Sequence, residues 1–158
     1  MPEKLWLYGG AGLLALISLL IKAFGIPNIL APYPLPFLIV IFSGGKYVFP
    51  FITPILYIFV LKLFSNSKHF AKMIIILILG FAILNYIFFQ NAWDLGVKYQ
   101  SLQYAQFVAM ENIIGFLLAL TLAVMGHIKK SRRLVLSANL VLFALLSWCA
   151  FPYLGEVL

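Results

Sequence analysis

The chain has 158 residues, of which 65% are hydrophobic and only 9% are charged, and its mean hydropathy is +1.09. Soluble domains are about half apolar and about a quarter charged, so this composition excludes a water-soluble monomer and predicts a chain dissolved in a bilayer. The formal net charge is +7, but no basic patch interleaved with aromatic residues occurs, which argues against a nucleic-acid-binding protein.

Five apolar segments follow one another along the chain, and each is about long enough to cross a membrane as a helix. The first opens with the balanced pair Glu3 and Lys4 and lacks a small-x-small cleavage site. We therefore expect a retained helix rather than a signal peptide. The sequence predicts an all-α integral membrane protein with a single domain, a five-transmembrane-helix bundle over residues 1–158. The helices are expected at residues 5–24, 46–64, 72–92, 107–127 and 134–153.

A proline-rich loop, residues 25–45, separates the first two helices. Its first part, GIPNILAPYPLP, has four prolines in twelve residues. Proline removes a backbone donor and biases the preceding residue toward extended geometry, so this part is not helical. The apolar stretch 35–64 is too long for one untilted span and is interrupted by Gly44, Gly45, Pro50 and Pro54. It is either one long kinked helix or a loop followed by a helix.

Basic residues are distributed unevenly between the two sides of such a bundle. With five helices, the N-terminus and the segments 62–72 and 127–133 share one side, whereas Lys22 and Lys98 fall on the other. Cytoplasmic loops of membrane proteins collect Lys and Arg, so we expect the N-terminus in the cytoplasm and the C-terminus outside. The basic residues on the first side are Lys4, Lys62, Lys68, Lys72, Lys129, Lys130, Arg132 and Arg133.

Two polar residues within the apolar segments are candidates for a ligand site. Glu111 lies in FVAMENIIGF, where a carboxylate either anchors a ligand in a cavity or is solvated at the outer boundary. Asn85 lies within the third helix. Its carboxamide either joins two helices by hydrogen bonds or lines a cavity.

Residues for metal binding or catalysis are not grouped in this sequence. His69 and His127 fall in basic segments and lack a Cys, His or carboxylate neighbour at metal-ligand spacing. A nucleophile elbow, a glycine-rich phosphate loop and an H-E-x-x-H motif do not occur. We expect no required cofactor and no metal, and a binding protein is favoured over an enzyme.

Four motifs occur in an order that is similar to one membrane-protein family. Residues 47–57 (YVFPFITPILY) resemble the pattern that opens helix 2 of that family, and residues 84–88 (LNYIF) resemble its helix-3 motif. Glu111 stands where helix 4 carries an acidic residue, and residues 148–154 (WCAFPYL) resemble the end of helix 5. With five helices and a long proline-rich first loop, the chain resembles the TspO/MBR family (tryptophan-rich sensory proteins and translocator protein).

The resemblance implies a fold and a ligand class. Helix 2 would begin near Lys46, residues 35–45 would form a lid over the mouth of the bundle, and Lys46 would lie at the outer interface. The protein would bind a flat hydrophobic ligand, a porphyrin (tetrapyrrole) or a sterol-like lipid, under the first loop, for transport or sensing. The resemblance is also consistent with a homodimer in a bacterial cell membrane.

The resemblance further implies a set of ligand-binding residues from four helices, with no catalytic residue among them. Thr53 stands at the place of the helix-2 tryptophan of the family, and Ser147 stands at that of the helix-5 tryptophan, with Trp148 beside it. Tryptophan-dependent conversion of porphyrin is therefore not expected, although binding is. The implied residues are Tyr47, Phe49, Thr53, Tyr57, Asn85, Phe88, Glu111, Ser147 and Trp148.

A second hypothesis assigns the same polar residues to helix packing. The chain would then be a structural or accessory subunit of a larger membrane complex and would have no ligand of its own.

Overall fold

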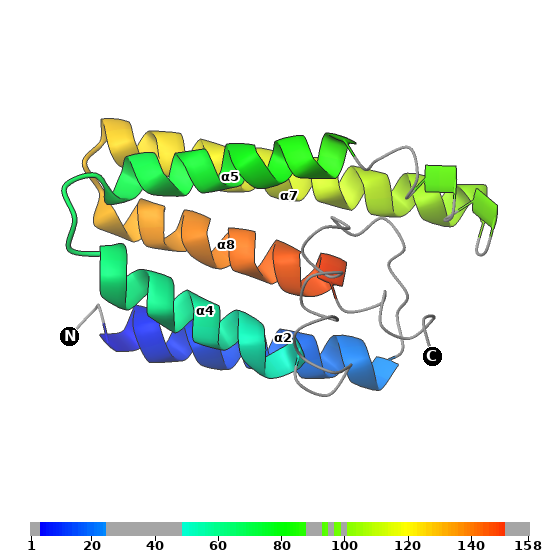
Figure 1. Ribbon diagram of the computed structural model, residues 1–158, viewed down its shortest axis with the longest axis horizontal. Helices are drawn as coiled ribbons and strands as arrows, with labels where there is room; N and C mark the ends of the chain where they lie inside the picture. Colours follow the sequence, from blue (N-terminus) through cyan, green and yellow to red (C-terminus); the bar gives the residue numbers. More distant parts are fainter. Residues whose placement is uncertain (1–3, 25–48, 88–92, 95–96, 99–100, 151–158) are drawn as a thin grey trace.

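The computed structural model describes residues 4–24, 49–87, 93–94, 97–98 and 101–150. Within these residues every regular element is helical, which confirms the all-α prediction for that part of the chain. The elements are a π-helix, η1 (Leu5–Gly9), and the α-helices α2 (Gly10–Phe24), α4 (Phe49–Phe64), α5 (Phe70–Ile87), α7 (Leu102–Ile128) and α8 (Arg132–Ala150) (Figure 1).

The helices form two pairs with α8 between them. Helix α2 packs on α4, and α5 packs on α7, whereas α8 contacts all four of these helices. Figure 1 shows α8 running along the middle of the bundle, with α5 and α7 on one side and α2 and α4 on the other. Because α8 is common to both halves, its contacts hold the two pairs together.

The contact between α7 and α8 is the most extensive one and is made by small residues. Gly115, Ala119, Ala123 and Gly126 recur at helical spacing on α7, and both alanines are fully buried. A Cβ atom on Gly126 would lie 2.7 Å from Val135 Cγ2, so the helix backbones are close enough to exclude a side chain there. Small residues at such spacing allow helix backbones to approach closely, and the resulting van der Waals contact drives association in lipid.

A tight turn joins α7 to α8. Ser131 donates its N–H to the Gly126 carbonyl at 2.9 Å, and Lys130 donates to the His127 carbonyl at 3.4 Å. This pair of hydrogen bonds is the Schellman arrangement, with Lys130 in the left-handed region at φ 50°. The turn closes α7 and reverses the chain, so that α8 runs back antiparallel along α7.

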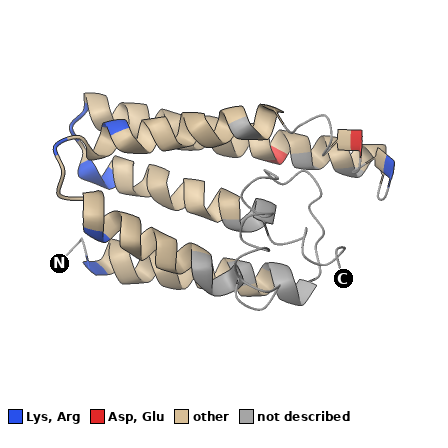
Figure 2. Cartoon of the chain, viewed as in Figure 1, with Lys and Arg blue, Asp and Glu red and all other residues tan. Residues whose placement is uncertain are grey.

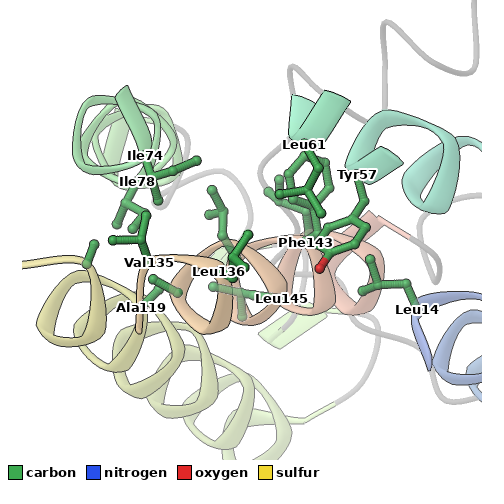
Figure 3. Close-up of a cluster of buried hydrophobic side chains, with 14 of the residues drawn as sticks. Leu14, Tyr57, Leu61, Ile74, Ile78, Ala119, Val135, Leu136, Phe143 and Leu145 are labelled. Carbon is green, nitrogen blue, oxygen red and sulfur yellow. The ribbon is translucent and has the colours of Figure 1, made fainter. Parts of the chain in front are cut away.

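Tyr57 connects α4 to both α2 and α8. Its side chain is fully buried, and its hydroxyl donates to the Trp6 carbonyl at 2.7 Å. Its ring meets the Phe143 ring edge to face, with 5.9 Å between the centroids. Such an aromatic pair adds roughly 1 kcal/mol to the burial of the two rings. Figure 3 shows Tyr57 between Leu14, Leu61 and Phe143 in the buried cluster.

Three helix starts differ from those expected from hydropathy, among them that of α8, which begins at Arg132 rather than at 134. Helix α7 begins at Leu102 rather than at 107, and Ala105 donates to the Ser101 carbonyl at 3.0 Å in its first turn. Gln and Ala are good helix formers, so the helix includes a polar stretch that precedes the apolar segment from which it was predicted. Helix α5 begins at Phe70 rather than at 72, because the Phe70 side chain is buried in the core.

The expected lid over residues 35–45 lies outside the described residues, as does Lys46. Helix α4 is described from Phe49 and continues past the buried Pro54 to Phe64. The start of the second helix near Lys46, and the choice between a lid and a long kinked helix, therefore stay predictions.

The expected gathering of basic residues at one end is found in the structure. The start of η1, the segment between α4 and α5 and the segment between α7 and α8 lie at the same end of the bundle (Figure 1). Figure 2 shows the Lys and Arg positions of these segments together, whereas the described Asp and Glu positions lie toward the other end.

We predict that Gly10→Ala destabilises the bundle. A Cβ atom at residue 10 would lie 2.5 Å from the Tyr57 hydroxyl and 2.7 Å from its Cζ, so the ring would have to move away from α2. Overpacking of this kind costs about 1–3 kcal/mol of unfolding free energy. Thermal unfolding in detergent measures the change.

The matched control is Gly12→Ala on the same helix, where nothing lies within 4 Å of the added Cβ. This change should leave stability unchanged or raise it by about 1 kcal/mol, because alanine favours helix. Equal effects of the two substitutions would show that Tyr57 does not pack against Gly10.

Candidate functional site

A groove between α5 and α7 is the best candidate for a ligand site. It has a volume of about 410 Å³, and its wall is largely apolar with two carboxamides in it. Ligand sites in proteins usually combine a mainly apolar wall with a few polar groups, within about 300–1,000 Å³. The residues that line the groove are Ala82, Asn85, Tyr86, Ala109, Asn112, Ile113, Phe116 and Leu117.

The shape of the groove follows from where small and large side chains fall on the two helices. Ala82 on α5 and Ala109 on α7 leave space between the helices, and Phe116 closes one part of it. Ile113 and Leu117 are both 58% exposed and form the outer rim on α7. The groove is therefore open along the outside of the bundle rather than enclosed within it.

The polar groups of the groove come from both helices. Asn112 on α7 is only 2% exposed and has an interaction partner within the structure, whereas Asn85 on α5 is half-buried. A carboxamide offers two N–H donors and one acceptor oxygen. Asn85 can therefore donate to, or accept from, a polar group of a molecule whose apolar body lies against Phe116 and Ile113.

The predicted site residues with described side chains fall into separate places. Asn85 lines the groove. Thr53 and Tyr57 are buried on α4, where Tyr57 packs on α2 and α8. Glu111 is half-buried on α7 and has an interaction partner, but it is not among the residues that line the groove. The structure thus places Asn85 on one side of α8 and the α4 residues on the other.

The other predicted site residues cannot be placed in this way. Tyr47 and Phe88 lie outside the described residues. Phe49 begins α4, and Ser147 and Trp148 are in the last turns of α8, but their side chains are outside the described part of the structure. Their convergence on one cavity stays a prediction.

Two buried carboxamides were not predicted from the sequence. Asn112 directly follows Glu111, and the charge of Glu111 is the more conspicuous signal in the sequence. Asn139 stands in the apolar run LSANLVLF of α8. Asn85 was predicted because it is a polar residue within an apolar segment. Asn139 has the same property and could have been predicted in the same way.

Asn139 is fully buried in the central helix, and neither its Nδ2 nor its Oδ1 has a hydrogen-bond partner among the described residues. Each buried polar group that lacks a partner costs stability, because it gives up its hydrogen bonds to water without replacement. Asn139 therefore differs from Asn112, which is nearly as buried but has a partner.

Metal ligands are not brought together in the described residues, where no group of three or more His, Cys, Asp or Glu side chains is found. His69 and His127 both lie at the basic end, next to α5 and in the last turn of α7. His127 lines a surface recess together with Lys68, Lys130 and Arg132.

Comparisons of the chain with protein-family models, with characterised proteins and with solved structures gave no match. The resemblance to the TspO/MBR family stays a prediction.

We predict that Asn139→Leu stabilises the protein. Leucine keeps the branching at Cγ and brings no polar group that needs a partner, so the unfolding free energy should rise by about 1–2 kcal/mol. The control is Asn112→Leu, which removes a carboxamide that has a partner and should not stabilise. Both changes are measured by thermal unfolding in detergent, and a loss of stability in Asn139→Leu would contradict the assignment of an unsatisfied carboxamide.

Proposed function

We propose that the chain is an integral membrane protein whose five helices cross the bilayer together. Two helical segments, Phe70–Ile87 and Ala105–Ile128, are long and apolar enough to cross a membrane, yet only 18% and 24% of their most apolar windows are buried. In a soluble protein an apolar helix of this kind would be mostly buried, since exposed apolar surface is unfavourable in water. The exposed apolar side chains of α5 and α7 therefore favour a lipid environment over water.

The remaining helices join these two through α8. Helix α8 contacts both α5 and α7 and also α2 and α4, so the helices share one environment. Exposed leucines and isoleucines on the outer faces of α2 and α4, such as Leu16 and Ile55, extend the apolar surface around the bundle. The basic end is proposed to face the cytoplasm, with the N-terminus inside and the C-terminus outside.

We predict that a cysteine at position 130 is labelled only from the cytoplasmic side. In a Cys149→Ser background, Lys130→Cys at the basic end should react with a membrane-impermeant maleimide only after the cells are opened. Lys98→Cys, near the other end, should react in intact cells. Labelling of both positions in intact cells, or the reverse pattern, would contradict the proposed orientation.

The groove is proposed to bind a flat hydrophobic molecule that has a hydrogen-bonding group, and this is the function that the geometry supports best. The observation that carries the proposal is the meeting of Asn85 and Asn112 in an otherwise apolar groove of about 410 Å³. Apolar burial against Phe116 and Ile113 would supply most of the affinity. A hydrogen bond to Asn85 would orient the ligand, because unpaired polar groups of a ligand are unfavourable in lipid surroundings.

A porphyrin or a sterol-like lipid fits this description, since each is a flat apolar body with polar groups at its edge. The ligand would enter from the bilayer, because the rim residues Ile113 and Leu117 are exposed on the outer face. Binding of this kind serves either transport or sensing of the molecule.

The second candidate function is that of an accessory subunit. Ala82 and Ala109 leave a recess of the kind that also receives a neighbouring transmembrane helix, and an asparagine can hydrogen-bond across a helix interface. A partner helix would then occupy the groove in place of a small molecule. The two functions differ in whether the purified chain binds a ligand by itself.

We predict that Ile113→Trp weakens porphyrin binding by tenfold or more. The larger side chain would fill the groove, in which Ile113 forms part of the rim. Protoporphyrin is titrated into the purified protein in detergent and followed by its own absorbance. Asn85→Leu should weaken binding by up to about tenfold through the loss of a hydrogen bond.

The matched control is Ile114→Trp. Ile114 is 59% exposed, almost the same as Ile113 at 58%, but it is not among the residues that line the groove. Binding should be unchanged in this variant. Equal binding by both tryptophan variants would exclude the groove as the site, and a wild-type protein that does not bind would favour the accessory subunit.

A further inference from the structure

A second recess lies at the basic end of the bundle, on the side of α8 away from the groove. It has a volume of about 240 Å³ and is formed where the start of η1, the end of α4 and the start of α8 meet. Three of its lining residues are cationic and three are leucines. Its lining consists of Lys4, Leu7, Leu61, Lys62, Ser65, Asn66, Arg132 and Leu136. We call this recess the basic pocket.

The three cations of the basic pocket come from three different elements. Lys4 immediately precedes η1, Lys62 is in the last turn of α4, and Arg132 is the first residue of α8. Sequence separation gives no reason for them to meet. Helices α2 and α4 pack on α8, and the ends of the helices that carry these residues lie at the same end of the bundle (Figure 2). The fold therefore brings the three positive charges close together.

Asn66 holds the arginine in place. Arg132 donates from Nη2 to the Asn66 Oδ1 atom at 3.0 Å, which joins the start of α8 to the segment after α4. Arginine binds phosphate through a planar fork of N–H donors, and a fixed fork loses less freedom on binding than a mobile one. The pocket therefore combines one oriented guanidinium with two flexible ammonium groups.

The residues that line the basic pocket include three cations and no Asp or Glu. The described Asp and Glu positions lie toward the opposite end of the bundle (Figure 2). Cations that share a recess with apolar walls raise the local positive potential and favour an anion. Basic pockets between transmembrane helices on the cytoplasmic side are suited to phosphate headgroups.

The leucines of the basic pocket indicate what carries the phosphate. Leu61 and Leu136 are almost fully buried beneath the cations, and Leu7 completes the apolar part of the wall. A free inorganic anion gains nothing from these side chains, whereas an amphiphile places its headgroup among the cations and its glycerol and upper acyl carbons against the leucines. The chemistry favours a lipid over a free anion.

We propose that the basic pocket binds the phosphate headgroup of an anionic membrane lipid, such as phosphatidylglycerol. The inference rests on the proposed membrane bundle but not on ligand binding in the groove. Anchoring of this kind would fix α2, α4 and α8 relative to one another at the membrane surface. It differs from a general attraction of basic residues to anionic membranes, because only the residues that line the pocket should matter.

The test uses two double variants with the same change in net charge. Lys4→Gln/Lys62→Gln removes two cations of the pocket, and Lys72→Gln/Lys129→Gln removes two from the same end that are not among its lining residues. Retention of phosphatidylglycerol and phosphatidylcholine by the purified full chain is measured by native mass spectrometry from a neutral detergent. Arg132→Gln is a third variant, interpreted only if its thermal unfolding matches wild type, since it also removes the contact to Asn66.

The first double variant should bind phosphatidylglycerol about thirtyfold more weakly, because each basic residue contributes about fivefold near an anionic headgroup. The control variant should stay within about twofold of wild type. Equal losses in both variants, or equal binding of phosphatidylcholine by wild type, would overturn the proposal. Competition by millimolar inorganic phosphate at the same affinity as the lipid would overturn the lipid assignment in favour of a free anion.

A failure of lipid binding in the basic pocket can be distinguished from a failure of ligand binding in the groove. Ile113→Trp alters the groove between α5 and α7 and should leave phosphatidylglycerol binding unchanged. Likewise, Lys4→Gln/Lys62→Gln should leave porphyrin binding unchanged, since α8 separates the two recesses.

Discussion

The close approach of α7 and α8 is the constraint on which the rest of the bundle depends. Gly115 and Gly126 both lie in this contact, and a Cβ atom at either position would lie within 3 Å of a side-chain atom of α8. Between them, Ala119 and Ala123 are completely buried. In the proposed membrane the helices would gain little from leaving lipid, so close van der Waals contact of this kind would supply the association energy.

With α8 held against α7, its opposite face is available to the other half of the bundle. Helices α2 and α4 pack there, and Tyr57 secures them through its hydrogen bond to the Trp6 carbonyl and its edge contact with Phe143. The central helix thus separates the molecule into two sides. The groove and the basic pocket lie on different sides, which is why each can be proposed and tested without the other.

Among the residues that the structure describes, three buried or half-buried asparagines illustrate how position decides the role of one side chain. Asn85 and Asn112 meet at a groove, where a carboxamide can serve a ligand or a partner helix. Asn139 is enclosed by the core of the central helix and has no hydrogen-bond partner among the residues described, so there the same group only lowers stability. The chemistry of the side chain is identical, and the difference lies in the space beside it.

The amino-acid sequence by itself determined the helical fold class and the end of the bundle at which most basic residues gather. Apolar segments of spanning length predicted an all-helical chain, and the described residues confirm the helices. The clustering of basic residues in alternate connecting segments predicted that they share one end, as they do. The apolar length of a segment and the number of basic residues in a connecting segment can both be counted along the chain. Neither depends on the rotation of a helix about its axis.

The tertiary structure alone decided which faces meet. Helices α5 and α7 are apolar nearly all round, so their sequences contain almost no periodic signal to show which side is inward. The rotation of each helix is set instead by where small residues permit contact, as Gly10 does for Tyr57. Sequence reasoning therefore identified Asn85 as a candidate but could not pair it with Asn112, and it could not bring Lys4, Lys62 and Arg132 together, because only packing fixes which residues of different helices become neighbours.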